Sequence, residues 1–181
     1  MLRRTDIGLL MFMLLLSTGG PAFAAPEDEY ALKAAFVLNF AKFTQWPDNS
    51  FTDTPDAFSL CVVGGKSLEA GFRTIEGKGV GGRSLQIDFI PEAGGFDRCN
   101  MLFVGGNMDR TALLRIFASV KEKPVLTIGE MPDFAKLGGV INFVSKEGKL
   151  RFEVNRETSL KQKVNISSRL LKLAIIVNGN E

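Results

Sequence analysis

Histidine is absent from this sequence of 181 residues, which removes several kinds of chemistry at once. The chain cannot build Ser-His-Asp or Cys-His catalysis, an HExxH zinc site or a histidine pH switch. The carboxylates are scattered, with Glu27 to Glu29 near the start of the first expected helix and Glu153 and Glu157 on either side of Asn155. Neither spacing requires a metal ion, and no nucleophile stands beside a base. We therefore expect no cofactor, no metal and no enzymatic activity.

One glycine-rich segment is similar to the end of a phosphate-binding loop. Gly64-Gly65-Lys66-Ser67 follows a strand-like run and precedes a helical pattern. A P-loop also needs a glycine five residues before Gly65, and that position holds Leu60. The glycines between 77 and 82 lie after a helix and before a strand, which is the wrong end of a βαβ unit for a dinucleotide. Nucleotide binding is not expected.

Glycines that follow strand-like runs could instead border a small-ligand crevice. Ligands of open parallel sheets bind beyond the carboxyl ends of the strands. The polar groups expected to face such a crevice are Lys66, Asn107 and Glu130. The alternative is that the glycines only allow tight strand-to-helix turns. The glycines concerned are Gly64, Gly65, Gly105, Gly106 and Gly129.

The two cysteines predict a disulfide. Cys61 lies within the first expected strand and Cys99 immediately before the third, so a bridge across a parallel sheet is geometrically plausible. An even pair in an exported protein is most simply a disulfide. It would act as a structural staple or, alternatively, as a redox-responsive bond whose reduction loosens the domain.

Residues 1–24 are typical of a cleavable secretory signal. Arg3 and Arg4 form a positive start, an apolar run follows from Ile7 to Leu16, and Ala22-Phe23-Ala24 fits an A-x-A cleavage site. We expect the mature chain to work outside the cytoplasm as a single domain, 25–181. The formal net charge of +2 argues against a nucleic-acid partner, because such a partner favours a dense basic face.

Short apolar runs alternate with helical patterns over most of the chain. This alternation predicts an α/β domain of three layers with a Rossmann-like, mostly parallel sheet. Residues 140–144 and 150–154 flank a turn and predict an antiparallel C-terminal hairpin, and a final helix is expected to start at Ser167 and to offer residues as far as Val177 for burial. The expected strands are 58–63, 85–90, 101–104 and 124–128, and the earlier helices are 27–44, 67–75 and a helix capped by Asn107 or Asp109 that runs to Val120.

Phenylalanine dominates the aromatic residues, with 15 copies against one tyrosine and one tryptophan. Phenylalanine has no polar edge, so most copies are expected to fill the core. Some of Phe36, Phe40, Phe43 and Trp46 could instead form an apolar partner surface.

Several stretches in order resemble the YfiR family of periplasmic regulatory proteins. The resemblance covers almost the whole of the expected mature chain. The matching segments are 31–43 with Trp46-Pro47, then 60–64, 99–105, 125–129, 138–143, 151–155 and 170–174.

The resemblance implies a periplasmic α/β domain that acts by binding and is able to form a homodimer, since many members of the family are dimeric. Members of the family hold an inner-membrane diguanylate cyclase of the YfiN type inactive through its periplasmic domain, and release raises cyclic di-GMP and favours biofilm formation. The resemblance places the contact surface around Ile141, Phe143, Phe152 and Glu153. The family's second cysteine pair, near Gly138-Gly139, is missing here. The alternative is a small-molecule binding protein that feeds a sensor kinase or an outer-membrane receptor from the glycine-lined crevice.

Overall fold

The computed structural model describes residues 26–91 and 94–179. The expected secretory signal, 1–24, lies outside the described residues. Most strands belong to a single curled sheet in the order β10-β8-β7-β6-β5-β2-β4-β3. Neighbours are parallel except for the β7–β8 and β3–β4 pairs. The strands of this sheet are β2 Ala57–Val63, β3 Gly79–Val80, β4 Arg83–Phe89, β5 Met101–Val104, β6 Leu126–Gly129, β7 Ile141–Lys146, β8 Lys149–Asn155 and β10 Ile175–Val177.

A second, antiparallel pair joins two short strands, β1 and β9, beside the main sheet. Their bounds are Thr44–Gln45 and Asn165–Ile166. The helices are α1 Pro26–Lys42, α2 Ser67–Arg73, α3 Arg110–Ser119, α4 Arg156–Lys161 and α5 Ser168–Leu171, with short 3-10 turns at Asp48–Phe51 and Phe96–Arg98.

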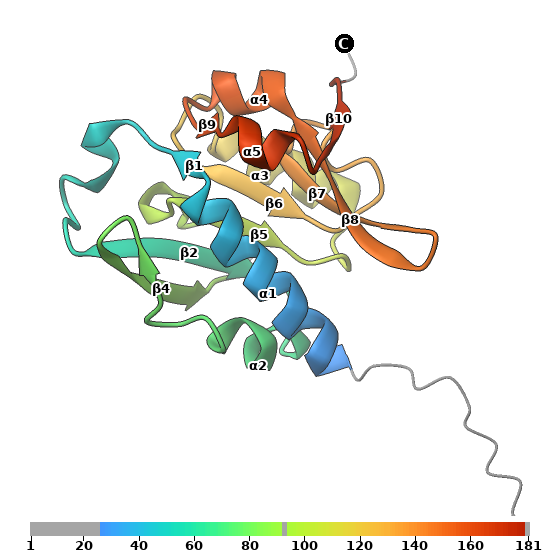
Figure 1. Ribbon diagram of the computed structural model, residues 1–181, viewed down its shortest axis with the longest axis horizontal. Helices are drawn as coiled ribbons and strands as arrows, with labels where there is room; N and C mark the ends of the chain where they lie inside the picture. The colour runs from blue at the N-terminus through green and yellow to red at the C-terminus, as the bar shows by residue number, and fades with distance from the viewer. Residues whose placement is uncertain (1–25, 92–93, 180–181) are drawn as a thin grey trace, which may run out of the picture.

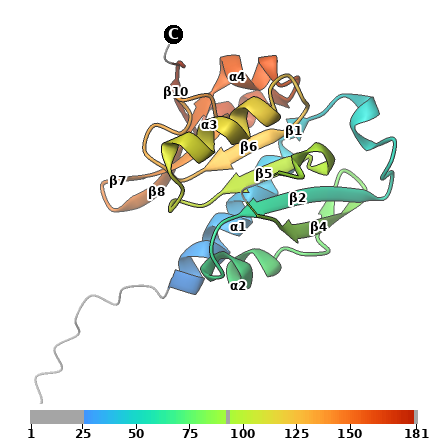
Figure 2. The same cartoon turned by 180° about the vertical axis from the view of Figure 1, so that it is seen from behind.

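Helices cover both faces of the sheet, which confirms the three-layer α/β prediction. Figure 1 shows α1 and α5 in front of the strands, and Figure 2 shows α3 on the opposite face. The larger core cluster joins the first face to α1, α2 and α5, and the smaller one joins the other face to α3. All seven residues of β2 are buried, as expected for a strand in the middle of a sheet with both faces covered.

Two local features determine where α3 begins and how α2 packs against α1. Asp109 caps α3, because its side chain accepts hydrogen bonds from the backbone N–H groups of Thr111 and Ala112 at 2.8 and 2.9 Å. Gly71 of α2 lies against α1 so closely that a Cβ atom there would be 2.5 Å from the Cβ of Tyr30. Glycine therefore lets the two helices meet over the end of β2.

The prediction of a long final helix is wrong. Ser167 caps a single helical turn, α5, and the chain then becomes β10, which pairs in parallel with β8. The β-branched residues Ile175 to Val177 suit an extended edge strand, and the free edge of β8 provides its hydrogen-bond partners.

No helix within the described ranges is long and apolar enough to cross a membrane.

Candidate functional site

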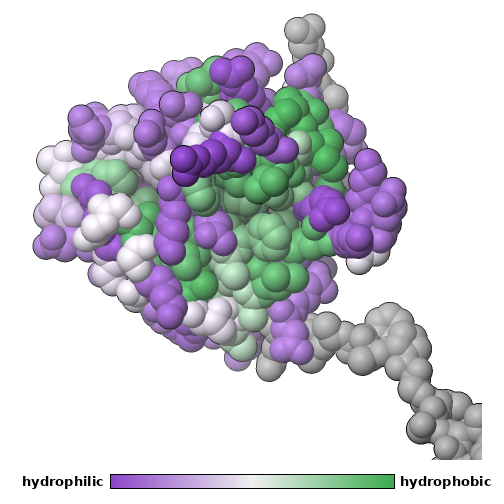
Figure 3. Space-filling model, in the orientation of Figure 1, coloured by the Kyte–Doolittle hydropathy of each residue, from purple (hydrophilic) through white to green (hydrophobic). Residues whose placement is uncertain are grey.

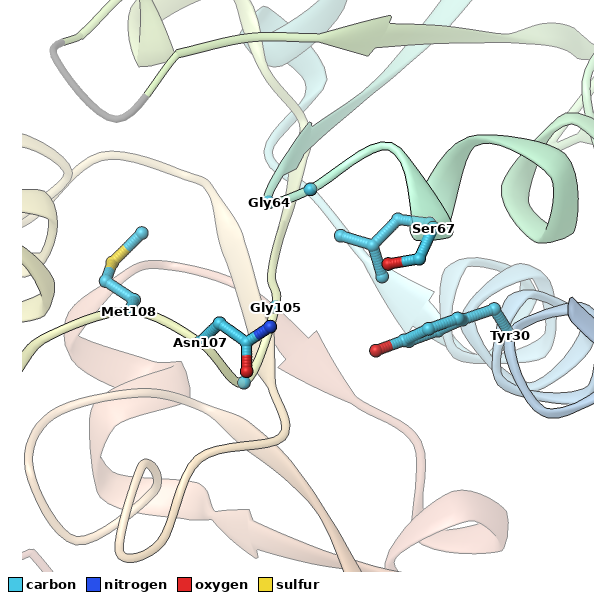
Figure 4. Close-up of a pocket in the computed structure, with 9 residues that line it drawn as sticks. Tyr30, Gly64, Ser67, Gly105, Asn107 and Met108 are labelled. Carbon is cyan, nitrogen blue, oxygen red and sulfur yellow. The ribbon is translucent and has the colours of Figure 1, made fainter. Parts of the chain in front are cut away.

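The loops after β2 and β5 meet at the carboxyl ends of the parallel strands. From β2 the chain turns to β4 on one side, while β5 and β6 build the sheet on the other, so the order of the strands reverses here. This is the position at which open α/β sheets bind ligands. Figure 4 shows Tyr30 of α1 across from Asn107, with Gly64, Ser67 and Gly105 around the opening. The structure thus brings together most of the crevice that the glycine pattern predicts.

Glu130, which follows β6, is held by three donors. Its carboxylate accepts hydrogen bonds from Tyr30 Oη at 3.1 Å, Lys33 Nζ at 2.5 Å and the Gly106 N–H at 2.9 Å. Lys33 also forms an ion pair with Glu29, and the Lys33 and Glu130 side chains are each only 8% exposed. The network fastens α1 to the ends of β5 and β6.

The network also shifts proton affinities. Burial acts to lower the pKa of Lys33, but hydrogen bonds and charges from Glu130 and Glu29 outweigh it, so the pKa is raised. Burial, followed by the charge of Glu130, raises the pKa of the Tyr30 hydroxyl. Lys33 is therefore a cation and Tyr30 a neutral donor around neutral pH.

The crevice itself is small, with a volume of about 80 Å³. Pockets for drug-sized ligands occupy roughly 300–1,000 Å³. Lys66 is exposed and does not line it, and a Cβ on Gly129 would be 2.4 Å from the Phe134 ring, so this glycine serves packing. Ligand binding in this crevice stays a prediction.

The residues that the resemblance offers as a contact surface are mostly buried. Ile141, Phe143 and Phe152 are at most 4% exposed, because this face of β7 and β8 lies under α1. The Phe40 ring of α1 lies 5.6 Å from the Phe143 ring and 4.9 Å from the Phe152 ring. These three side chains therefore cannot form a free surface, which corrects their expected placement.

Glu153 is the exception among these residues, because it is partly exposed. It points to the other face of the sheet from its neighbour Phe152. Its carboxylate accepts a hydrogen bond from Asn142 Nδ2 at 3.1 Å.

An apolar groove between α1 and α5 lies over these buried rings. We call it the α1–α5 groove, and its volume is about 300 Å³. Two of its apolar lining residues are notably exposed, Phe43 at 39% and Leu173 at 71%, and Ile176 of β10 is 53% exposed. In Figure 3, hydrophobic side chains gather over α1, α5 and β10. The groove is lined by Phe36, Asn39, Phe40, Phe43, Phe152, Arg169, Leu170 and Leu173.

The sequence gives part of the signal for this groove. The spacing of Phe36, Phe40 and Phe43 marks one face of α1, which the structure divides between the core and the surface, since Phe40 is fully buried and Phe43 exposed. The other wall depends on Leu173, which lies just past α5 and before β10. The expected continuous helix from Ser167 to Val177 does not predict this wall, because the wall forms only where the helix ends before Leu173.

The Cys61–Cys99 disulfide is present, as predicted. The two Cα atoms are 5.7 Å apart, and both residues belong to the core cluster under α3. Their exposures of 0% and 4% leave little of the bond open to solvent. This burial favours a structural staple over an easily reduced switch.

A family model described as YfiR/HmsC-like matches residues 30–175. The match confirms the resemblance carried by the ordered segments. It runs from Tyr30 in α1 to Ile175 at the start of β10, so it includes Glu130 with its donors Tyr30, Lys33 and Gly106 and every residue that lines the α1–α5 groove. No curated protein matches the sequence.

Proposed function

The chain belongs to the YfiR/HmsC-like family of periplasmic regulators, and on that premise we propose that it restrains an inner-membrane signalling protein by direct contact in the periplasm. The proposed partner is the periplasmic domain of a diguanylate cyclase. Binding keeps the cyclase inactive, and release raises cyclic di-GMP.

The α1–α5 groove is the observation that carries this proposal. Phe43, Leu173 and Ile176 expose large apolar surfaces on adjoining elements, beside Arg169 at the rim. Contiguous apolar surface with a polar rim is typical of protein interaction sites. Since Phe40 and Phe152 pack together as a buried, apolar floor, the groove can accept apolar side chains of a partner.

Regulation without chemistry requires unequal binding to two states of the partner. A regulator that binds the inactive conformation about 100-fold more tightly shifts that equilibrium by about 2.7 kcal/mol. A few buried apolar contacts, each worth roughly 1–2 kcal/mol, are sufficient for this difference.

The test uses two leucine substitutions in a strain whose own copy of the gene is deleted. Leu173→Gln removes an apolar side chain from the rim of the groove. Leu114→Gln is the matched control, because Leu114 is 45% exposed on α3, on the other face of the sheet. Both variants are expressed with their leader, and periplasmic levels are compared by immunoblot.

We expect deletion to raise cyclic di-GMP, and the wild type and Leu114→Gln to restore the low level. Leu173→Gln weakens binding by about 1–2 kcal/mol, roughly 5–30-fold, and leaves cyclic di-GMP high at equal protein level. Unchanged cyclic di-GMP on deletion would rule out a cyclase partner. Full restoration of the low cyclic di-GMP level by Leu173→Gln would rule out the groove as the contact surface.

A further inference from the structure

A second, much larger cavity lies at the opposite end of the sheet from the glycine-lined crevice. It occupies about 820 Å³ between the end of α3, the segment before β7, and α4. Phe117 and Leu137 provide an apolar wall, and the Phe117 ring is braced edge-on by Phe134 at 5.1 Å. The volume suits a drug-sized molecule.

Four lysines and two glutamates surround the cavity, which gives it a positive balance. Lys161 is paired with Glu157 at 2.7 Å, and Lys136 with Asp133 at 2.8 Å. Within the described part of the chain, no ion pair involves Lys121 or Lys163. Each lies two residues beyond the end of a helix, Lys121 after α3 and Lys163 after α4, and Glu122 is the chain neighbour of Lys121. Two cations are thus available to an anionic group.

Gln162 supplies an independent sign of a missing partner. It lines the cavity and is 4% exposed, yet its Oε1 atom has no hydrogen-bond donor. A buried acceptor without a donor destabilises a fold, and such atoms are rare in native proteins. A ligand with an N–H or O–H group would satisfy it.

The backbone conformation at the rim of the cavity also indicates a functional site. Lys163 directly follows the C-cap of α4 and has φ 57°, a left-handed conformation that glycine usually provides at this position. Glu122, beyond the end of α3, has φ 61°. Strained positions of this kind gather at functional sites. At position 163 a lysine that lines the cavity, and not a glycine, takes this conformation.

We propose that this cavity binds a small amphipathic acid. Its anionic group pairs with Lys121 and Lys163, an N–H or O–H group donates to Gln162 Oε1, and an apolar body lies on Phe117 and Leu137. The site is separate from the α1–α5 groove, so the proposal stands whether or not the cyclase is the partner.

The probe is 8-anilinonaphthalene-1-sulfonate, which combines a sulfonate, an N–H donor and aromatic rings. Its uncharged analogue N-phenyl-1-naphthylamine lacks only the sulfonate. Titrations follow probe fluorescence on the full mature chain. The test variant is Lys121→Gln with Lys163→Gln, and the charge-matched control is Lys146→Gln with Lys149→Gln, on the exposed β7–β8 turn.

We expect one saturable site for the sulfonate probe. The Lys121/Lys163 variant should weaken it about tenfold, as for the loss of two partly solvated ionic contacts, and should leave the uncharged analogue unaffected. The control variant should bind like the wild type. Gln162→Met, which removes the acceptor, should weaken both probes.

Three outcomes would overturn the proposal. They are the absence of saturable binding, an equal loss of affinity in the control variant, and a loss caused by Arg169→Gln in the α1–α5 groove while the lysine variant binds normally. Because Lys121 and Lys163 are exposed, the melting temperature should not fall in the lysine variant. That measurement separates lost binding from lost folding.

Discussion

Replacing Glu130 with glutamine tests whether the Lys33–Glu130 pair fastens α1 to the sheet. Each side chain is 8% exposed, and the carboxylate accepts from Tyr30 and Gly106 as well as from Lys33. Removing one partner of a buried ion pair costs about 3–5 kcal/mol. Lys33 keeps its second partner, Glu29, whose side chain is 58% exposed, so we expect a smaller loss of about 2–3 kcal/mol.

Urea unfolding of the purified chain measures this loss. For a domain of this size, the expected destabilisation lowers the melting temperature by roughly 5–10 °C. A double-mutant cycle with Lys33→Met isolates the pair, because the double variant leaves no buried charge uncompensated (Glu29, which also loses its partner, is 58% exposed) and should recover at least about 1 kcal/mol relative to the sum of the single losses. A loss below about 0.5 kcal/mol for Glu130→Gln, or full additivity, would refute the reasoning.

Two further stability predictions follow from the same structure. Reduction of the Cys61–Cys99 bridge, which closes a separation of 38 residues, should lower the free energy of unfolding by about 4 kcal/mol. Urea unfolding with and without a thiol reductant measures this loss. A loss below about 1 kcal/mol would contradict a stabilising role for the disulfide. Stability should fall as pH rises above 10, because the raised pKa values of Lys33 and Tyr30 mean that the folded chain holds these protons more tightly than the unfolded chain. Melting temperatures measured across this pH range should fall less in the Lys33→Met variant than in the wild type. Identical pH profiles for the two proteins would exclude Lys33 as a source of the pH dependence.

The parts of the fold that depend on local patterns could be predicted from the sequence. The strand Met101–Val104 agrees residue for residue, because it is an apolar run ended by two glycines. Asp109 caps α3 as one of two candidates. The hairpin 140–154 needs only a turn between two alternating runs, and its antiparallel pairing is confirmed.

The parts that depend on distant pairing could not be predicted in this way. Ile175 to Val177 form a strand because β8 offers an edge. Their β-branched side chains suit a strand, but a run of three residues is too short to be separated by its pattern alone from the end of the helical pattern before it. The Lys33–Glu130 contact joins residues separated by 97 positions, and only the packing of α1 across the strands brings them together.

The expected contact surface around Phe143 and Phe152 likewise could not be judged from the sequence alone. Phe143 and Phe152 share a face because they are cross-strand partners, and α1 covers that face. The hydrophobic type of these residues indicates burial or binding equally well. Only the three-dimensional arrangement shows that the exposed apolar surface is displaced onto Phe43 and Leu173.

Site-specific photo-cross-linking in living cells tests the central claim, contact with a membrane partner through the α1–α5 groove, most directly. A photoreactive phenylalanine derivative replaces Leu173 in one strain and Leu114 in another, and cross-linked products are identified by mass spectrometry. The account predicts a single inner-membrane signalling protein captured from position 173 and absent from position 114. Capture of the same protein only from position 114, or of no membrane protein from position 173, would contradict it.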